Sequence, residues 1–90
     1  MIIKNIKNKI ISQLKPIYLK INDNNHLKKD EIINYLEITV VSDYFIQKSL
    51  ITRHKLIYQI IGNKINKIHS LSLYTYTLSE WKKIKKNKIL

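Results

Sequence analysis

The sequence contains no cysteine, and this absence excludes several kinds of chemistry. Without thiols the chain cannot form disulfides, bind zinc through cysteine, use a thiol nucleophile, or hold an iron–sulfur cluster with its own thiolates. A single glycine and a single proline exclude the common glycine-rich phosphate-binding loops. No apolar run approaches the length of a membrane-spanning helix, and the first residues lack the apolar segment of a secretory signal. We therefore expect no membrane partner and a cytoplasmic location.

Acidic residues are also scarce, because six of them stand against 17 basic residues and leave a formal net charge of +11. An excess of positive charge permits binding to nucleic acids. However, isoleucine, lysine and asparagine supply 44 of the 90 residues and alanine is absent, a composition typical of a very AT-rich genome. The charge is therefore compatible with nucleic-acid binding but does not demonstrate it.

The length of 90 residues predicts a single domain over residues 1–90, and 44% apolar residues suffice for a modest core. Hydrophobic periodicity predicts the elements of this domain. The first helix ends before Pro16, and the capping-box pattern from Thr77 to Glu80 begins the last one, which continues into a basic C-terminal tail from about residue 85. In chain order, the sequence predicts helix 2–14, strand 17–22, strand 35–40, helix 50–62, strand 69–74 and a helix from residue 77.

This α-β-β-α-β-α order predicts an α+β fold with a three-stranded mixed sheet. The first two strands are close enough in the chain to pair antiparallel, and the helix before the third strand is a crossover that favours a parallel pair. Each strand has one apolar parity, so we expect helices on one face of the sheet and an opposite face that is open or covered by a partner. The residues expected to share one core are Ile38, Val40, Ile57, Leu71, Leu73 and Trp81.

Four short motifs, in this order and spacing, resemble the BolA-like family, and the last of them resembles its bacterial BolA branch. They are VSDYF at 41–45, the pair Arg53-His54 followed by KLIY, the run IHSL at 68–71, and YTYTLSEW ending at Trp81. The matching spacing covers roughly residues 3–82. The resemblance implies a class II KH-like fold. It also implies two activities, namely DNA binding with transcriptional regulation linked to the general stress response and cell morphology, and pairing with monothiol glutaredoxins.

Three features of the sequence depart from the pattern of that family. Gln47 stands where the family usually has a glycine, and glutamine adopts a positive φ poorly. The loop between the first two strands is about two residues shorter than usual, with Asn25 and His26 near its usual serine position. Asn34 and Tyr35 occupy the place where some members have a cluster-binding histidine or cysteine.

The candidate DNA-binding residues are four basic side chains around the start of the central helix. Arginine offers a bidentate fork to phosphate or base edges, and the N-terminus of a helix attracts phosphate. The alternative is that Arg53 or His54 ties down the preceding turn by hydrogen bonds to carbonyl groups. Residues 41–61 also have the outline of a helix-turn-helix, whereas the KH-type GxxG clamp is impossible with one glycine. The candidates are Lys48, Arg53, His54 and Lys55.

His69 is the candidate iron ligand, and His26 is a weaker one. The resemblance implies that His69 is a ligand of a two-iron two-sulfur cluster shared with a glutaredoxin and glutathione. We expect the chain to bind no cofactor by itself, because it has no thiolate ligands. The alternative is a histidine satisfied by a backbone partner near the packed face. The outward tyrosines Tyr18, Tyr35, Tyr74 and Tyr76, with Lys20, are suited either to stacking on unpaired bases or, as we favour, to cross-strand packing.

No arrangement typical of an enzyme is present, because the histidines lack metal-ligand spacing and the carboxylates are scattered. We therefore expect no catalytic residue. The first hypothesis is a regulator that binds double-stranded DNA as a monomer or weak homodimer. The second is an adaptor of iron–sulfur trafficking or redox chemistry that binds a monothiol glutaredoxin.

Overall fold

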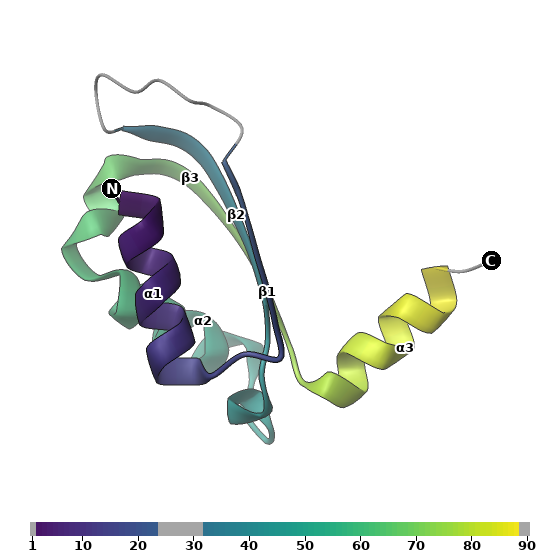
Figure 1. The fold of residues 1–90 in the computed structure, drawn as a ribbon. Helices are drawn as coiled ribbons and strands as arrows, with labels where there is room; N and C mark the ends of the chain where they lie inside the picture. The colour runs from purple at the N-terminus through teal and green to yellow at the C-terminus, as the bar shows by residue number, and fades with distance from the viewer. Residues whose placement is uncertain (1, 24–31, 89–90) are drawn as a thin grey trace.

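The computed structural model describes residues 2–23 and 32–88, and the elements within these ranges follow the predicted order (Figure 1). Periodic isoleucines form the first helix and alternation forms the strands, as expected from their spacing. The predicted boundaries agree to within a few residues. The elements are α1 (Ile2–Leu14), β1 (Tyr18–Asp23), β2 (Ile33–Val41), the 3-10 helix η1 (Asp43–Phe45), α2 (Leu50–Ile61), the 3-10 helix η2 (Gly62–Lys67), β3 (Ile68–Tyr76) and α3 (Leu78–Lys88).

The strands of the described residues form one mixed sheet in the order β1-β2-β3, which confirms the predicted architecture. β1 pairs with β2 antiparallel, from Tyr18 opposite Val41 to Asp23 opposite Leu36. β2 pairs with β3 in parallel, and α2 is the crossover between them. No helix of the described residues is long and apolar enough to span a bilayer.

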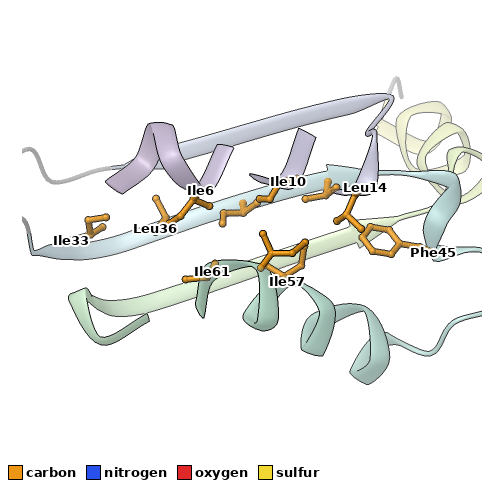
Figure 2. Packing of buried hydrophobic residues seen from close by; sticks show 11 residues of the cluster. Ile6, Ile10, Leu14, Ile33, Leu36, Phe45, Ile57 and Ile61 are labelled. Carbon is orange, nitrogen blue, oxygen red and sulfur yellow. The ribbon is translucent and has the colours of Figure 1, made fainter. Parts of the chain in front are cut away.

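The core lies between one face of the sheet and the helices α1 and α2, as Figure 2 shows. Ile6 and Ile10 of α1, Leu36 of β2 and Ile57 of α2 belong to this one cluster, and none of them has exposed surface. The expected core positions Ile38, Val40 and Ile57 are fully buried. Leu71 and Leu73 are partly buried and pack against the same cluster. Ile17, in contrast, precedes β1 and is 53% exposed, so it does not take the inward place that alternation predicted.

The prediction that Trp81 joins this core is wrong. Trp81 stacks on Tyr18 with a ring separation of 5.1 Å and lies 5.5 Å from the ring of Tyr76. Tyr18 and Tyr76 flank Val41 in one row across the sheet, on the face opposite α1 and α2. Val41 is fully buried, because this aromatic cluster covers it. The cluster attaches α3 to the outer face of the sheet, and Figure 1 shows α3 on the side away from α1 and α2.

Ser42 joins the end of α1 to the end of β2. Its hydroxyl, 1% exposed with the rest of the residue, donates to the carbonyl of Leu14 at 2.6 Å and accepts from the N–H of Tyr44 at 3.1 Å. Lys15 takes a positive φ of 45° after the last residue of α1, and its N–H donates to the carbonyl of Ile11. The serine of the VSDYF motif thus satisfies a carbonyl at the end of one helix and caps the next.

Candidate nucleic-acid interface

The turn between η1 and α2 keeps the conformation that a glycine would normally supply. Gln47 has a φ of 62°, and the N–H of the next residue, Lys48, donates to the carbonyl of Phe45 at 3.1 Å. A glutamine in the left-handed region crowds its Cβ against the backbone. Gln47 therefore takes the positive φ that was in doubt for a glutamine, and the chain holds it in a strained conformation.

Ser49 then caps α2. Its hydroxyl accepts from the N–H of Thr52 at 3.2 Å and donates to the side chain of the same residue at 3.0 Å. The first turn of α2 contains no acidic residue. The partial positive charge at this helix terminus is therefore not neutralised within the turn and attracts anions.

Arg53 faces inward from the first turn of α2 and is only 6% exposed. Its Nε donates to the carbonyl of Lys48 at 2.9 Å, and one terminal nitrogen donates to the carbonyl of Thr75 at 3.1 Å. The guanidinium also lies 5.7 Å from the ring centre of Phe45. Arg53 thus holds the turn before α2 by a hydrogen bond to a carbonyl group, as the alternative to DNA contact proposed. It also binds a carbonyl near the end of β3.

Glu80 completes the partners of Arg53. The carboxylate accepts from both terminal nitrogens of the guanidinium, at 2.8 and 3.1 Å, and from the N–H of Thr77 at 2.9 Å. The Thr77 hydroxyl accepts from the N–H of Glu80 in return, so the predicted capping box is present. These hydrogen bonds, first that from Arg53 and then that from Thr77, lower the pKa of Glu80 below its ordinary value. The RH and TLSEW motifs therefore meet in one junction that fixes α3 relative to α2.

The other predicted DNA-binding residues differ in how accessible they are. Lys55 is exposed on α2, and His54 beside it is half-buried. Lys48 is half-buried, donates to the carbonyl of Tyr44 at 2.8 Å, and lies 4.6 Å from the centre of that ring. The structure thus brings three of the four candidates to the surface around the start of α2, while Arg53 serves the internal junction.

α3 also contributes to this region, although none of the four candidate residues belongs to it. Two open hollows flank the Arg53–Glu80 pair, with volumes of about 670 and 570 Å³. Lys82 borders the first and Lys83 the second. A buried arginine needs an acidic partner, and the sequence contains few carboxylates to choose from. Glu80 was still not identified, because it lies 27 residues from Arg53 along the chain.

A short helix, a turn and a longer helix follow one another at residues 43–61, but the first of them is a single 3-10 turn. η1 contains three residues, whereas the first helix of a helix-turn-helix normally crosses the DNA backbone as a helix of several turns. α2, with 12 residues, has the length of a recognition helix.

His69 lies at the start of β3 and is exposed, so its imidazole does not reach the packed face as its parity suggested. Asn34 is exposed, and the hydroxyl of Tyr35 donates to Ser72 at 3.1 Å. The described residues contain no group of three or more His, Asp or Glu side chains placed to hold a metal ion. His26, the weaker candidate, lies outside the described residues.

The outer face of the sheet places the predicted tyrosines in two settings. Tyr18 and Tyr76 pack against Trp81 of α3, a helix contact that differs from the expected cross-strand packing. Tyr74 is 42% exposed, in one row with Lys20 and Thr39. Tyr18 and Tyr76 therefore help to attach α3, whereas Tyr74 is exposed on the same face.

Comparison with known proteins identifies relatives over most of the chain. Residues 10–80 match the family model described as BolA-like protein. An uncharacterized protein of Buchnera aphidicola from Acyrthosiphon pisum is 38% identical over 91 residues, covering 96% of this chain and 88% of that protein. The protein of Escherichia coli named DNA-binding transcriptional regulator BolA is 29% identical, covering 90% of this chain and 80% of its own. The structure of BolA1 from Arabidopsis thaliana superposes with a TM-score of 0.77 at 28% identity, covering 89% of this chain and 95% of that one.

Proposed function

Since the chain belongs to the BolA-like family, we propose that it is a DNA-binding transcriptional regulator of the kind linked to the general stress response and cell morphology. The observation that carries the proposal is the exposed first turn of α2. This turn has no acidic residue, is capped by Ser49, and is flanked by the predicted residues Lys48, His54 and Lys55. The name of the Escherichia coli relative supports the same activity.

The physical basis of binding is neutralisation of phosphate by a positively charged helix end. Backbone N–H groups and the helix dipole at the start of α2 favour an anion, and Lys55 adds a full charge. Each phosphate neutralised by a lysine releases condensed counterions, which makes affinity fall with salt. In this proposal Arg53 is a positioning residue, because its guanidinium is used to hold the turn, β3 and α3.

The test is the salt dependence of binding to a duplex of about 20 base pairs, roughly two helical turns. Lys55→Ala should weaken binding and reduce the slope of log K against log salt by about one. Lys4→Ala is the matched control, since Lys4 is an exposed lysine of α1. Binding to unrelated duplexes is subtracted, because the net charge of +11 attracts any DNA. An unchanged slope for Lys55→Ala with the fold intact would contradict the proposal.

A second candidate function is an iron–sulfur or redox adaptor that pairs with a monothiol glutaredoxin. The observation that favours it is the exposure of His69 at the start of β3, where a partner could reach its imidazole. Because this chain has no cysteine, thiolate ligands of a shared cluster would come from the partner and glutathione.

His69→Ala tests this second function. A mixture of the chain with a glutaredoxin, glutathione, iron and sulfide should give a heterodimer whose absorption and circular dichroism spectra differ from those of the glutaredoxin homodimer. The substitution should restore the homodimer spectrum, since imidazole and thiolate ligands differ in their effect on iron. A heterodimer spectrum that does not depend on His69 would exclude it as a ligand.

A further inference from the structure

The first turn of α2 exposes two large aliphatic side chains. Leu50 is 61% exposed and Ile51 is 69% exposed, the largest values among the large apolar residues in the described part of the chain. They directly follow the cap residue Ser49, and the next residue, Thr52, is exposed as well. The buried side of α2 is formed by Arg53, Ile57, Ile60 and Ile61. The exposed aliphatic pair therefore takes no part in the core.

The surroundings of this pair are basic. Lys55 lies one turn further along α2 from Ile51, and Leu50 borders the same hollow as Lys48 and Lys83. Of the nearby carboxylates, Glu80 is paired with Arg53, and Asp43 lines only the other hollow. A partner suited to this surface is negatively charged and also offers apolar groups.

Duplex DNA offers this combination in its major groove, where the C5-methyl of thymine is the apolar group on the base edges. The residues at the N-terminus of a recognition helix are the ones that reach those edges. We propose that Leu50 and Ile51 recognise thymine through its C5-methyl, so that the protein prefers A·T-rich major grooves. This inference rests on the proposed function, because it assigns the bases that the same helix terminus contacts.

The experiment compares two A·T duplexes of about 20 base pairs that differ only in thymine or uracil, which pair alike but differ in the C5-methyl. The wild-type protein should bind the thymine duplex more tightly, by about three- to fourfold for each methyl it contacts. Ile51→Ser should lose the part of this preference that comes from Ile51, and Leu50→Ser the part from Leu50. Because both side chains are largely exposed, neither substitution should change the thermal unfolding of the protein.

Ile32→Ser is the matched control, because Ile32 is also an exposed isoleucine, at 42%. It precedes the first residue of β2, whereas η1 and α2 follow the last residue of that strand. This variant should keep the full preference for thymine. Comparing variants on both duplexes cancels any difference in shape between the two duplexes.

Equal binding of the two duplexes by the wild-type protein would overturn the inference. If Lys55→Ala still reduced the salt slope in that case, the proposed DNA binding would stand without thymine recognition. If neither duplex bound in a salt-dependent way, both proposals would fail. A surface that instead docks an acidic protein helix would show no difference between thymine and uracil, which also overturns the inference.

Discussion

At the scale of single residues, Gln47 shows that a turn can hold a glutamine at a positive φ. Its φ of 62° costs a residue with a Cβ about 1–2 kcal/mol. The hydrogen bond from the N–H of Lys48 to Phe45, and the tie from Arg53 to the carbonyl of Lys48, hold the turn from its C-terminal side. Neighbouring contacts therefore impose the conformation that the residue itself disfavours.

Gln47→Gly should stabilise the protein by about 0.5–1 kcal/mol, because relief of strain exceeds the extra conformational entropy of glycine in the unfolded chain. Gly62→Ala is the opposite control, since Gly62 has a φ of 63° and a ψ of −139°, which suit glycine. That variant should lose stability. Urea unfolding measures both, and a Gln47→Gly protein less stable than the wild type would contradict the strain at this turn.

At the scale of elements, the depth of each strand in the sheet determines the cost of its substitutions. Leu36 in the central strand β2 is fully buried, whereas Leu71 in the edge strand β3 is partly buried. Leu36→Ala should therefore cost about 3–5 kcal/mol, and Leu71→Ala about 1–3 kcal/mol. Chemical denaturation gives both values. Equal costs would mean that β3 is as deeply packed as β2.

The junction of α2 with α3 should give the protein an acid-sensitive component of stability. Because the pKa of Glu80 is lowered in the folded state, its carboxylate stabilises the fold at pH values above the ordinary glutamate pKa of about 4.3. This contribution is lost as the pH falls through the lowered pKa. Its size is small, since the Glu80 side chain is 46% exposed and solvent screens the pair.

Glu80→Gln tests this junction because it keeps the shape of the side chain but removes its charge. The variant should unfold at lower urea than the wild type at neutral pH, and the two midpoints should converge as the pH is lowered below 4.3, about the ordinary glutamate pKa. A constant difference between the midpoints across this range would show that the charge of Glu80 contributes nothing.

The elements of this fold were largely predictable, but their attachments were not. The helical spacing of isoleucines and the alternation of apolar residues in strands indicate which side of each element is buried. The positions of α1, α2 and the strands could therefore be predicted from the sequence. Alternation also assigns odd positions of β2 to solvent, which hid the burial of Val41 under Trp81. The Arg53–Glu80 pair was not predicted because charge patterns identify neighbours along a helix, and these residues belong to different helices.

At the scale of the whole molecule, Arg53 joins the two sides of the sheet. α1 and α2 pack on one face and α3 attaches to the other (Figure 1). Hydrogen bonds from Arg53 reach the carbonyl of Thr75 near the end of β3 and Glu80 at the start of α3. The same residue ties the turn before α2. The exposed start of α2 is therefore presented by a fixed junction, which suits a surface that must match a regular groove.

DNA binding through the start of α2 is tested most sharply by the change in backbone amide chemical shifts when a duplex of about 20 base pairs is added to the protein. The largest changes should fall on residues 48–55, at the cap and first turns of α2, with smaller ones at the basic residues of α3. Largest changes on the outer face of the sheet, around Tyr35 and Tyr74, or at His69, would contradict it.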